Sequence, residues 1–577
     1  MIEEGLKRPS AVMATTILAA GQRFRGLLPT RVDLRGMAAS PRRDLVAGLT
    51  VAIVALPLAL AFGISSGLGA GAGLVTAIVA GVLAAFFGGS NLQVSGPTGA
   101  MTVVLVPIIT HYGADAVLVV GLLAGLFLVL LGWAGAGRTM RYIPLPVVEG
   151  FTIGIAVIIA LQQVPAALGV LATAEGVLPT ALAALGPWLG APDWTAPAIA
   201  VAVAGAMLIA ARLRPGLPVS FVAVGIVTAA VAWLDLPVGT IGAIPAGLPL
   251  PTIPNLQGID LGRLVLPAVA VAALASFESL LSATVADGMR VGERHNSDRE
   301  LFGQGVANLV VPFFGGVPAT AAIARTAVNV RSGARSRMAA ITHSLVLLVV
   351  VLVASGLVAR IPLAALAGVL IATAVQMVQV SSVRALLRST RGDAVVLILT
   401  AAATIAVDLV TAVILGLIVA GAFALQQVAR SAHLDEMPLD PGNHADEESS
   451  LLDEHIVAFR LDGALFFGAA HAFLLELAEV SDVRVVVLRL SRVATLDATG
   501  ASVLRDTIRR LEGRGVTVLL SGARAEHRGV FEGLGVFASL SDRRHIFDAT
   551  PAAIDHARVH VARRLHEEDV AAAQLAG

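Results

Sequence analysis

Two short stretches of the sequence combine proline, glycine and small residues where the surrounding chain is strongly apolar. GPTGAM occupies residues 96–101 and VPATAA occupies residues 317–322, and each comes after a Phe-Phe-Gly-Gly and before a short apolar run. Pro97 and Pro318 suit the first turn of a helix, where a missing N–H costs nothing. A helix that begins there carries free N–H groups and about half a positive charge at its N-terminus, so two such termini facing each other predict an anion site. For either stretch alone, the alternative is a simple kink.

Two ionisable residues lie in equally apolar surroundings. Arg325 stands in AAIARTAVNV, and Glu278 stands in ALASFESLLSATVADG with Ser282 one helical turn later on the same face. A charge at the centre of a bilayer costs at least about 2.5–3.5 kcal/mol on insertion scales, so a functional role is the first interpretation. The alternative is an ion pair between Arg325 and Glu278 with a structural role, which does not exclude the functional one.

The composition is that of a polytopic membrane protein. The chain has 577 residues, of which 56% are hydrophobic and only 14% charged, and its mean hydropathy is +0.85. The net charge of zero argues against a nucleic-acid binder, and without cysteine there is no disulfide or thiolate metal site. Arginines surround a weakly apolar segment in residues 1–43, which we interpret as a cytoplasmic arm and not as a signal peptide.

Residues 44–430 are expected to form the transmembrane domain, with fourteen apolar elements. Two of them, at 98–111 and 320–331, are shorter than the ~20 residues that cross a bilayer. Full spans are expected at 46–66, 69–89, 114–133, 146–168, 195–212, 217–234, 263–286, 299–314, 338–358, 362–379, 392–408 and 410–429.

The arginines orient these elements. Arginine clusters fall at every second boundary, whereas the long segments 168–194 and 236–258 contain no Lys or Arg. Since positive charge in short loops stays in the cytoplasm, both termini are expected there. The two short elements are the third and the tenth, seven apart, and an odd number of elements inverts the second copy. Paired interrupted segments of this kind predict a 7+7 inverted repeat with a substrate site at the bilayer midplane.

After the last span the composition changes to that of a soluble domain. Residues 431–451 form an acidic linker, and runs of strand length alternate with helical patterns over 452–566, followed by a tail at 567–577. This pattern predicts a cytoplasmic α/β domain. No metal-ligand spacing, P-loop or nucleophile constellation was recognised, so neither an enzyme nor a cofactor is expected.

Several stretches resemble the signatures of the SulP (sulfate permease) anion transporters. They are QVSGPTGAM, SFESLLSATVADG, HNSDRELFGQGVAN and GGVPATAAIARTAVNVRSGA, while SRVATLDATGASVL is similar to the STAS domain that usually follows. The resemblance implies a fold of core and gate domains shared with uracil permeases. It also implies transport of sulfate, bicarbonate, chloride or dicarboxylates by a homodimer in the plasma membrane, with an elevator motion of the core domain against the gate domain.

The resemblance also implies roles for single residues. Arg325 matches an arginine that adds positive potential near the anion, and Glu278 with Ser282 matches the site of the coupling ion. A threonine used by sodium-coupled members is replaced by Ile323, which weakens the case for sodium. Phe62 stands where many members have tyrosine, giving a more apolar pocket. The implied anion contacts are Thr98, Gly99, Ala100, Met101, Thr320, Ala321, Ala322 and Ile323.

In the STAS-like region, Thr499 of LDATG occupies the position at which stand-alone relatives are phosphorylated. The alternative, which we favour, is that Thr499 and Asp497 only cap the helix that follows.

We therefore expect a secondary active transporter of small anions. Two helix termini contribute about one positive charge together and Arg325 adds another, so protonation of Glu278 raises the charge of the site from near +1 to near +2. This arithmetic predicts symport with protons. One alternative is an uncoupled channel or exchanger on the same scaffold. Another is a nucleobase permease, but Arg325 and the STAS-like domain argue against it.

Overall fold

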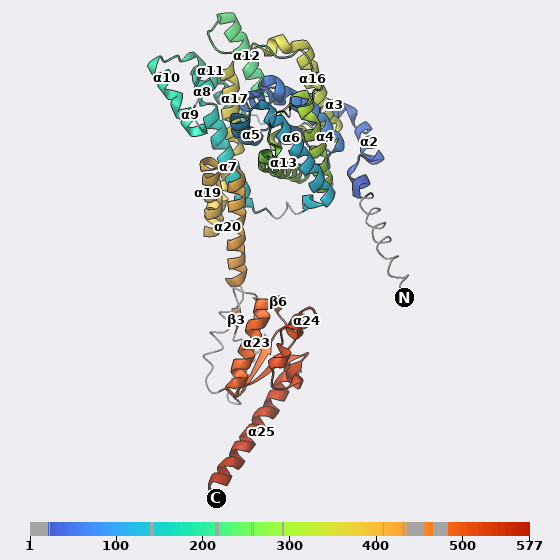
Figure 1. Cartoon of the computed structure of the whole chain (residues 1–577), viewed down its shortest axis with the longest axis vertical. Helices are drawn as coiled ribbons and strands as arrows, with labels where there is room; N and C mark the ends of the chain where they lie inside the picture. Colours follow the sequence, from blue (N-terminus) through green and yellow to red (C-terminus); the bar gives the residue numbers. More distant parts are fainter. Residues whose placement is uncertain are drawn as a thin grey trace. The chain divides into compact units, whose positions relative to one another are not determined.

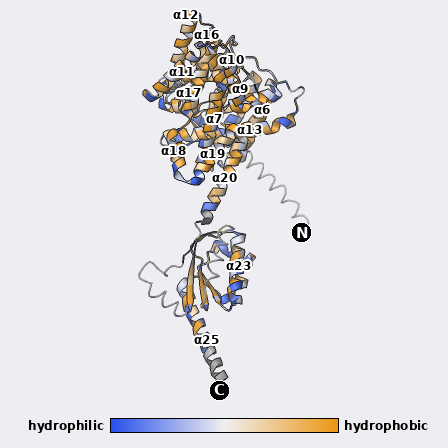
Figure 2. Ribbon diagram, turned by 90° about the vertical axis from the view of Figure 1, so that its left-hand side faces the viewer, coloured by the Kyte–Doolittle hydropathy of each residue, from blue (hydrophilic) through white to orange (hydrophobic). Residues whose placement is uncertain are grey.

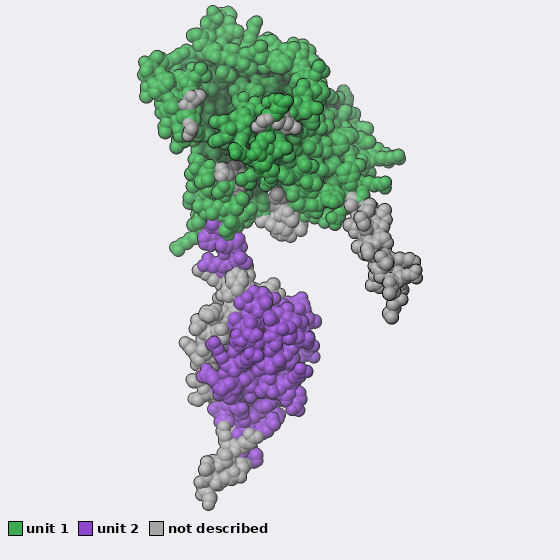
Figure 3. All heavy atoms as spheres, in the orientation of Figure 1, with its two compact units in different colours: residues 1–418 green, residues 419–577 purple. Residues whose placement is uncertain are grey.

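The chain divides into two compact units, Met1–Ile418 and Val419–Gly577, which are coloured separately in Figure 3. The computed structural model describes residues 21–576 apart from 22, 139–142, 173, 175, 214–217, 256, 258, 291–293, 408, 431–432, 436–454 and 466–482. The expected acidic linker thus lies outside the described residues, except for the short strand β3 (His433–Asp435).

The first unit is helical, and its helices are predominantly apolar (Figure 2). Among the described residues, eight helices are long and apolar enough to cross a bilayer. They are α3 (Pro41–Ser65), α4 (Ala70–Phe87), α6 (Ala114–Ala134), α7 (Leu145–Gln162) with α8 (Val164–Leu168), α11 (Thr195–Leu213), α13 (Leu261–Met289), α16 (Met338–Val358), and α17 (Leu363–Met377) with α18 (Val380–Ser389) (Figure 1).

Shorter helices complete the unit. Each of the fourteen expected elements has a helix in the described residues, and the third and tenth are indeed short. The remaining elements are α5 (Gly99–Tyr112), α12 (Val219–Leu234), α14 (Ser297–Val310), α15 (Ile323–Arg331), α19 (Arg391–Ala406) and α20 (Leu409–Arg430), with α9 (Val177–Ala183) and α10 (Leu185–Gly190) in a connection. The boundary between the two units, after Ile418, falls within α20.

The ends of some elements differ from expectation. The ninth element was expected to continue to residue 314, but α14 ends at Val310 and a 3₁₀ turn, η2 (Val311–Phe314), follows. Pro312 explains this end, because proline has no N–H to donate within an α-helix. The expected C-terminal tail is also helical, since α25 runs from Thr550 to Ala576.

Small residues allow close packing among the helices of the first unit. α14 packs against α6 and α4, α16 against α3 and α4, α7 against α19, and α11 against α17. A methyl group added to Gly125 of α6 would lie 2.6 Å from the backbone nitrogen of Leu309, and one added to Gly303 of α14 would collide with Gly88. Glycine is needed at such points because the two backbones approach each other directly.

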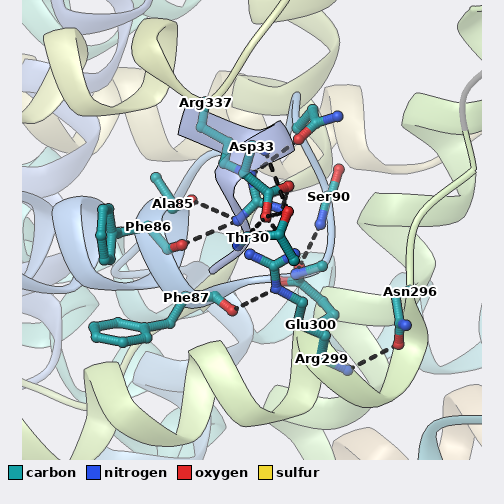
Figure 4. Close-up of polar contacts among 12 residues, drawn as sticks. Thr30, Asp33, Ala85, Phe86, Phe87, Ser90, Asn296, Arg299, Glu300 and Arg337 are labelled. Atoms are coloured by element: carbon teal, nitrogen blue, oxygen red, sulfur yellow. Dashed lines mark hydrogen bonds and ion pairs between the residues drawn. The ribbon is translucent and has the colours of Figure 1, made fainter. Parts of the chain in front are cut away.

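The arm before the first span is anchored by one carboxylate (Figure 4). Asp33 forms a capping box with Thr30 at the start of α2 (Arg31–Ala38). The same carboxylate accepts a 2.8 Å bond from Nη1 of Arg299 and lies 3.3 Å from Nη2 of Arg337. Arg299 and Arg337 also donate to carbonyl oxygens of residues 85–87 at the C-terminus of α4, where a helix favours cations. Asp33 therefore connects the arm to the ends of three helices.

The charge of Asp33 should stabilise the protein. Partial burial opposes that charge, but hydrogen bonds from Thr30 and the nearby Arg337 and Arg299 hold the pKa of the Asp33 carboxyl below its usual value. Asp33→Asn keeps an acceptor for Thr30 but removes the charge. We therefore expect the free energy of unfolding to fall by about 2 kcal/mol, which is typical of a hydrogen bond to a charged group. The readout is thermal unfolding of the purified protein at pH 7, with the exposed Asp115→Asn as control.

The stability that Asp33 contributes should depend on pH. Because the pKa of Asp33 is lower in the folded state, its contribution is complete above the unfolded pKa of about 3.9 and disappears as the pH falls through the folded value. The difference in melting temperature between wild type and Asp33→Asn should therefore be constant near neutral pH and shrink only below about pH 4. A difference no larger than that of Asp115→Asn at pH 7 would contradict the anchoring role.

The second unit is built on a mixed sheet. Its strands are β3, β4 (Ile456–Leu465), β5 (Val485–Arg489), β6 (Val493–Leu496), β7 (Thr517–Ser521) and β8 (Ile546–Phe547). The order is β3-β4-β5-β7-β8, with β3 antiparallel to β4, the other neighbours parallel, and β6 paired with β4.

Helices cover both faces of this sheet. Since successive strand residues point to opposite faces, Val486 and Leu488 pack with α23 (Ala498–Gly513), while Val485 and Val487 pack with α25. α24 (Ala525–Gly533) and the short turns η3 (Phe537–Ser539) and η4 (Arg543–His545) complete the unit.

Candidate anion site

The two proline-containing stretches meet in a short antiparallel bridge. Strand β1 (Ser95–Gly96) pairs with β2 (Thr320–Ala321), with Ser95 opposite Ala321 and Gly96 opposite Thr320. The paired residues are 226 and 224 positions apart in the chain, from Ser95 to Ala321 and from Gly96 to Thr320. α5 begins three residues after β1 and α15 begins two residues after β2, so the N-termini of both half-helices are held at one place.

Both helix starts leave backbone donors available. Thr98 caps α5 by accepting a 3.4 Å bond from the N–H of Met101, and Ala322 caps α15 without a side-chain bond. Among the described residues, the N–H groups of Gly99, Ala100 and Ile323 have no hydrogen-bond acceptor. They precede the first intrahelical bonds, which start at Thr102 in α5 and at Thr326 in α15. These donors, with the positive ends of two helices, make the place attractive to an anion.

Glu278 reaches this place from the middle of α13. Oγ1 of Thr98 donates a 2.8 Å hydrogen bond to Oε2 of Glu278, while Thr98 itself is buried and Glu278 is partly exposed. The carboxylate is therefore attached to the residue that caps α5. A change in its charge acts directly on the N-terminus of that half-helix.

Arg325 is 1% exposed and contacts the same segment one residue earlier, at Pro97. Its Nη2 donates a 2.8 Å bond to the carbonyl oxygen of Pro97, and its Nη1 has no hydrogen-bond partner. A methyl group added to Gly96 would lie 2.6 Å from that Nη1, and Gly96 has a φ of +152°, so glycine is required there for two reasons. A buried guanidinium N–H without an acceptor is a donor available to a ligand.

Arg325 and Glu278 do not form a direct ion pair within the described residues. Instead they bond to successive residues of one segment, Arg325 to Pro97 and Glu278 to Thr98. The structural alternative considered from sequence, a direct pair between these charges, is therefore not the arrangement found. Both charged groups therefore lie at the N-terminus of α5 without contacting each other.

The other expected anion contacts fall into two groups. Ala322 and Ile323 are partly exposed at the start of α15, while Met101 and Phe62 are buried around the start of α5. Thr320 and Ala321 belong to the bridge itself: Thr320 is fully buried and its hydroxyl lies 3.0 Å from that of Ser279.

Ser282, which we expected to act with Glu278, donates a 3.0 Å hydrogen bond to Thr326. Thr326 accepts another from the N–H of Val94, just before β1. The position of Ser282 thus links α13 to α15 and to the chain leading into the bridge.

From the sequence, Asn308 is expected to line a cavity or to bond neighbouring helices, whereas Ser279 and Gln304, which also hold the bridge, were not identified. Ser279 accepts a 3.2 Å bond from the N–H of Ala321. Asn308 accepts from the N–H of Ala319 and donates to its carbonyl oxygen, and Gln304 donates to Ser95 at 2.6 Å. The spacing of Gln304 and Asn308, one turn apart in an apolar helix, was the available signal. Their partners could not be known without the fold.

In the second unit, Thr499 is exposed in the first turn of α23. Asp497 caps this helix by accepting a 2.7 Å bond from the N–H of Gly500. The cap is therefore supplied by Asp497, and the hydroxyl of Thr499 lies open to solvent.

The model of the sulfate permease family matches residues 42–400, and that of the STAS domain matches residues 452–553. The chain belongs to the sulfate permease family. The resemblance noted from the signature stretches is thereby confirmed, and the family is one of membrane anion transporters.

Relatives match over most of the chain. YvdB of Bacillus subtilis, which is named for sulfate transport, is 34% identical over 517 residues, covering 88% of this chain and 96% of its own. The bicarbonate transporter BicA of Picosynechococcus is 32% identical over 525 residues, covering 86% of this chain and 91% of its own.

A solved structure agrees with the fold. Murine Slc26a9, an anion transporter, has a TM-score of 0.79 and covers 93% of this chain and 94% of its own at 18% identity. The predicted fold class, an inverted-repeat membrane domain followed by a STAS domain, is confirmed by this likeness together with the family matches.

Gly99 gives the sharpest test of the α5 terminus. A Cβ at Gly99 would collide with Cδ1 of Ile159 in α7 and lie 3.1 Å from the Phe62 ring, so Gly99→Val alone disturbs packing as well as any ligand. In Gly99→Val with Ile159→Ala, the second change makes room for the added methyl groups. We expect this double variant to fold and elute like wild type but to lose anion binding, because valine covers the free N–H groups.

The control is Ile159→Ala alone, which should bind the anion like wild type to within a few fold. Binding of labelled anion to the detergent-purified protein is the measurement. Wild-type affinity in the well-folded double variant would remove the anion from this terminus.

Arg325 should contribute charge and directed hydrogen bonds. We expect Arg325→Ala to weaken anion binding about 30-fold, since a buried charge-assisted bond contributes about 2 kcal/mol. Arg325→Lys should recover only part of this, because lysine lacks the planar fork that serves Pro97 and a ligand together. Titration of each protein with the anion should give affinities that decrease from wild type to Arg325→Lys to Arg325→Ala. Equal affinities would reduce Arg325 to a structural link.

Proposed function

We propose that this protein is a secondary active transporter that couples the entry of a small anion to protons. The anion is held between the N-termini of α5 and α15, with Arg325 as its cationic contact and Glu278 as the proton carrier. The observation that carries the proposal is the pair of helix starts joined by the β1–β2 bridge, each with unused backbone donors. The names of the relatives support sulfate and bicarbonate as the first substrates to test.

The contacts of Glu278 support a coupling role. As a carboxylate it accepts a hydrogen bond from Thr98, the cap of α5. A proton on Glu278 removes one negative charge beside two termini that together carry about one positive charge. The protonated site then holds an anion more strongly, so proton and anion favour each other's binding. Such reciprocity between two ligands is what symport requires.

The packing around α5 supports an elevator motion. The start of α5 belongs to the bridge with α15, yet Gly99 lies against Ile159 of α7, which itself packs on α19. The anion site thus borders a second group of helices. Movement of the bridge and its helices against that group transfers the site between the two sides of the membrane.

The arrangement of the chain in the cell follows from the arginine pattern. Clusters at alternate boundaries support both termini, and hence the STAS domain, in the cytoplasm, and we propose the plasma membrane as the location. We further propose that the protein works as a homodimer.

Glu278→Gln tests the coupling directly. Glutamine resembles the protonated carboxyl, so the variant should still bind the anion and exchange it between the two sides. It should lose accumulation driven by a pH gradient, because no proton is carried. Uptake of labelled sulfate, bicarbonate, fumarate and chloride into proteoliposomes is measured with pH and sodium gradients imposed separately.

The matched control is Ser276→Ala, half a turn away on α13, whose hydroxyl bonds only the carbonyl of Ala272 in its own helix. This variant should accumulate the anion as wild type does. A requirement for sodium, or accumulation by Glu278→Gln in response to acid outside, would contradict proton coupling while leaving the anion site to be judged by binding.

A further inference from the structure

Three histidines converge in the second unit. His545 is the last residue of η4, and His556 and His560 lie one turn apart on α25. One ring nitrogen from each lies within 4.8 Å of those from the other two. The ring centroids are 5.0 to 5.6 Å apart.

The fold explains why these rings meet. α25 lays Ala553, Ala557 and Val561 on one face of the sheet. His556 and His560 sit beside that apolar stripe on the helix, where they meet the turn that leads into β8. The ring of Phe547 in β8 packs against His556 at a centroid distance of 5.2 Å. Packing of the helix on the sheet therefore fixes the approach of the histidines.

Hydrogen bonds orient the most buried ring. Nδ1 of His545 lies 3.3 Å from Oγ of Ser541, and Ser541 donates at 3.2 Å to Oε1 of Glu512. The chain of bonds is consistent when Nδ1–H of His545 donates to Ser541. The lone pair of Nε2 is then directed toward the other two histidines. A carboxylate acting on a histidine in this way is typical of the outer shell of metal sites.

The spacing of the ring nitrogens fits a metal ion. Nε2 of His545 and Nε2 of His560 are 3.3 Å apart. Two nitrogens bound to one tetrahedral zinc at about 2.0–2.1 Å are separated by about 3.3 Å. Without an ion, one of these nitrogens must carry a proton to avoid two facing lone pairs.

We propose that His545, His556 and His560 bind one divalent transition-metal ion, with zinc as the ion that fits best. Three imidazoles suit zinc, and a water molecule completes a tetrahedron. Two histidines at i and i+4 on a helix are a common half of such sites. The third ligand comes from a different element, so the ion would fasten α25 to the turn before β8.

This inference does not depend on the anion site, which lies in the other unit. Its test uses the full-length protein in detergent with no histidine tag, because a tag would bind the same ions. After treatment with a chelator, the protein is dialysed against zinc and the bound metal is measured by mass spectrometry. We expect one zinc per chain and a higher melting temperature of the second unit with zinc than without.

Single variants define the ligands. His556→Gln and His560→Gln should each raise the zinc dissociation constant at least tenfold, and Ser541→Ala should raise it about tenfold without removing a ligand. His566→Gln, an exposed histidine on the same helix, is the matched control and should bind like wild type. Unfolding of the metal-free variants at the wild-type temperature shows that they remain folded.

Cobalt gives an independent readout. With Co²⁺ in place of zinc, the wild type should develop the visible absorption of a tetrahedral cobalt centre, and His560→Gln should not. The proposal is overturned if wild type and His560→Gln retain the same amount of zinc, or if His566→Gln loses as much zinc as His556→Gln and His560→Gln do.

Discussion

The membrane unit depends on one constraint: two helices begin in its interior, where their first N–H groups cannot be left to water. The β1–β2 bridge answers part of this need by pairing the chain just before each helix. Thr98 answers another part by capping α5. The donors that remain, together with the Nη1 of Arg325, are concentrated at one place. N–H groups without acceptors cost free energy when the protein folds. We infer that these same groups make the site selective for anions.

The bridge is held by buried polar side chains on the helices α13 and α14. Asn308 satisfies both backbone groups of Ala319, and Gln304 and Ser279 bond residues of the two strands. These contacts come from Ser279 in α13 and from Gln304 and Asn308 in α14, so the helix starts are fixed from both helices at once. Supports of this kind favour one arrangement of the two helix starts, which would limit the entropy lost on binding of the proposed anion.

We could predict the helices and the two interrupted stretches from the sequence, because these features depend on local hydropathy and on proline and glycine. The sequence did not allow their partners to be predicted. The anchoring of Asp33 on Arg299 spans 266 residues, and the pairing of Thr98 with Glu278 spans 180. The three histidines were missed for the same reason, since only the folded sheet brings His545 beside α25. Local pattern determines elements, whereas contacts between elements decide which polar residues act together.

The proposed coupling rests on the separation of Arg325 from Glu278. In a direct ion pair, each charge would satisfy the other, and an entering anion would have to break that contact before binding the arginine. Here Pro97 and Thr98 stand between the two groups as acceptor and donor. An anion bound there, as we propose, would meet a guanidinium with a free N–H, and the carboxylate would act on it only through its charge. A proton on Glu278 changes that charge without rearranging the contacts of Arg325. We infer that this indirect arrangement lets the proton set the affinity for the anion while the geometry of the anion site stays the same.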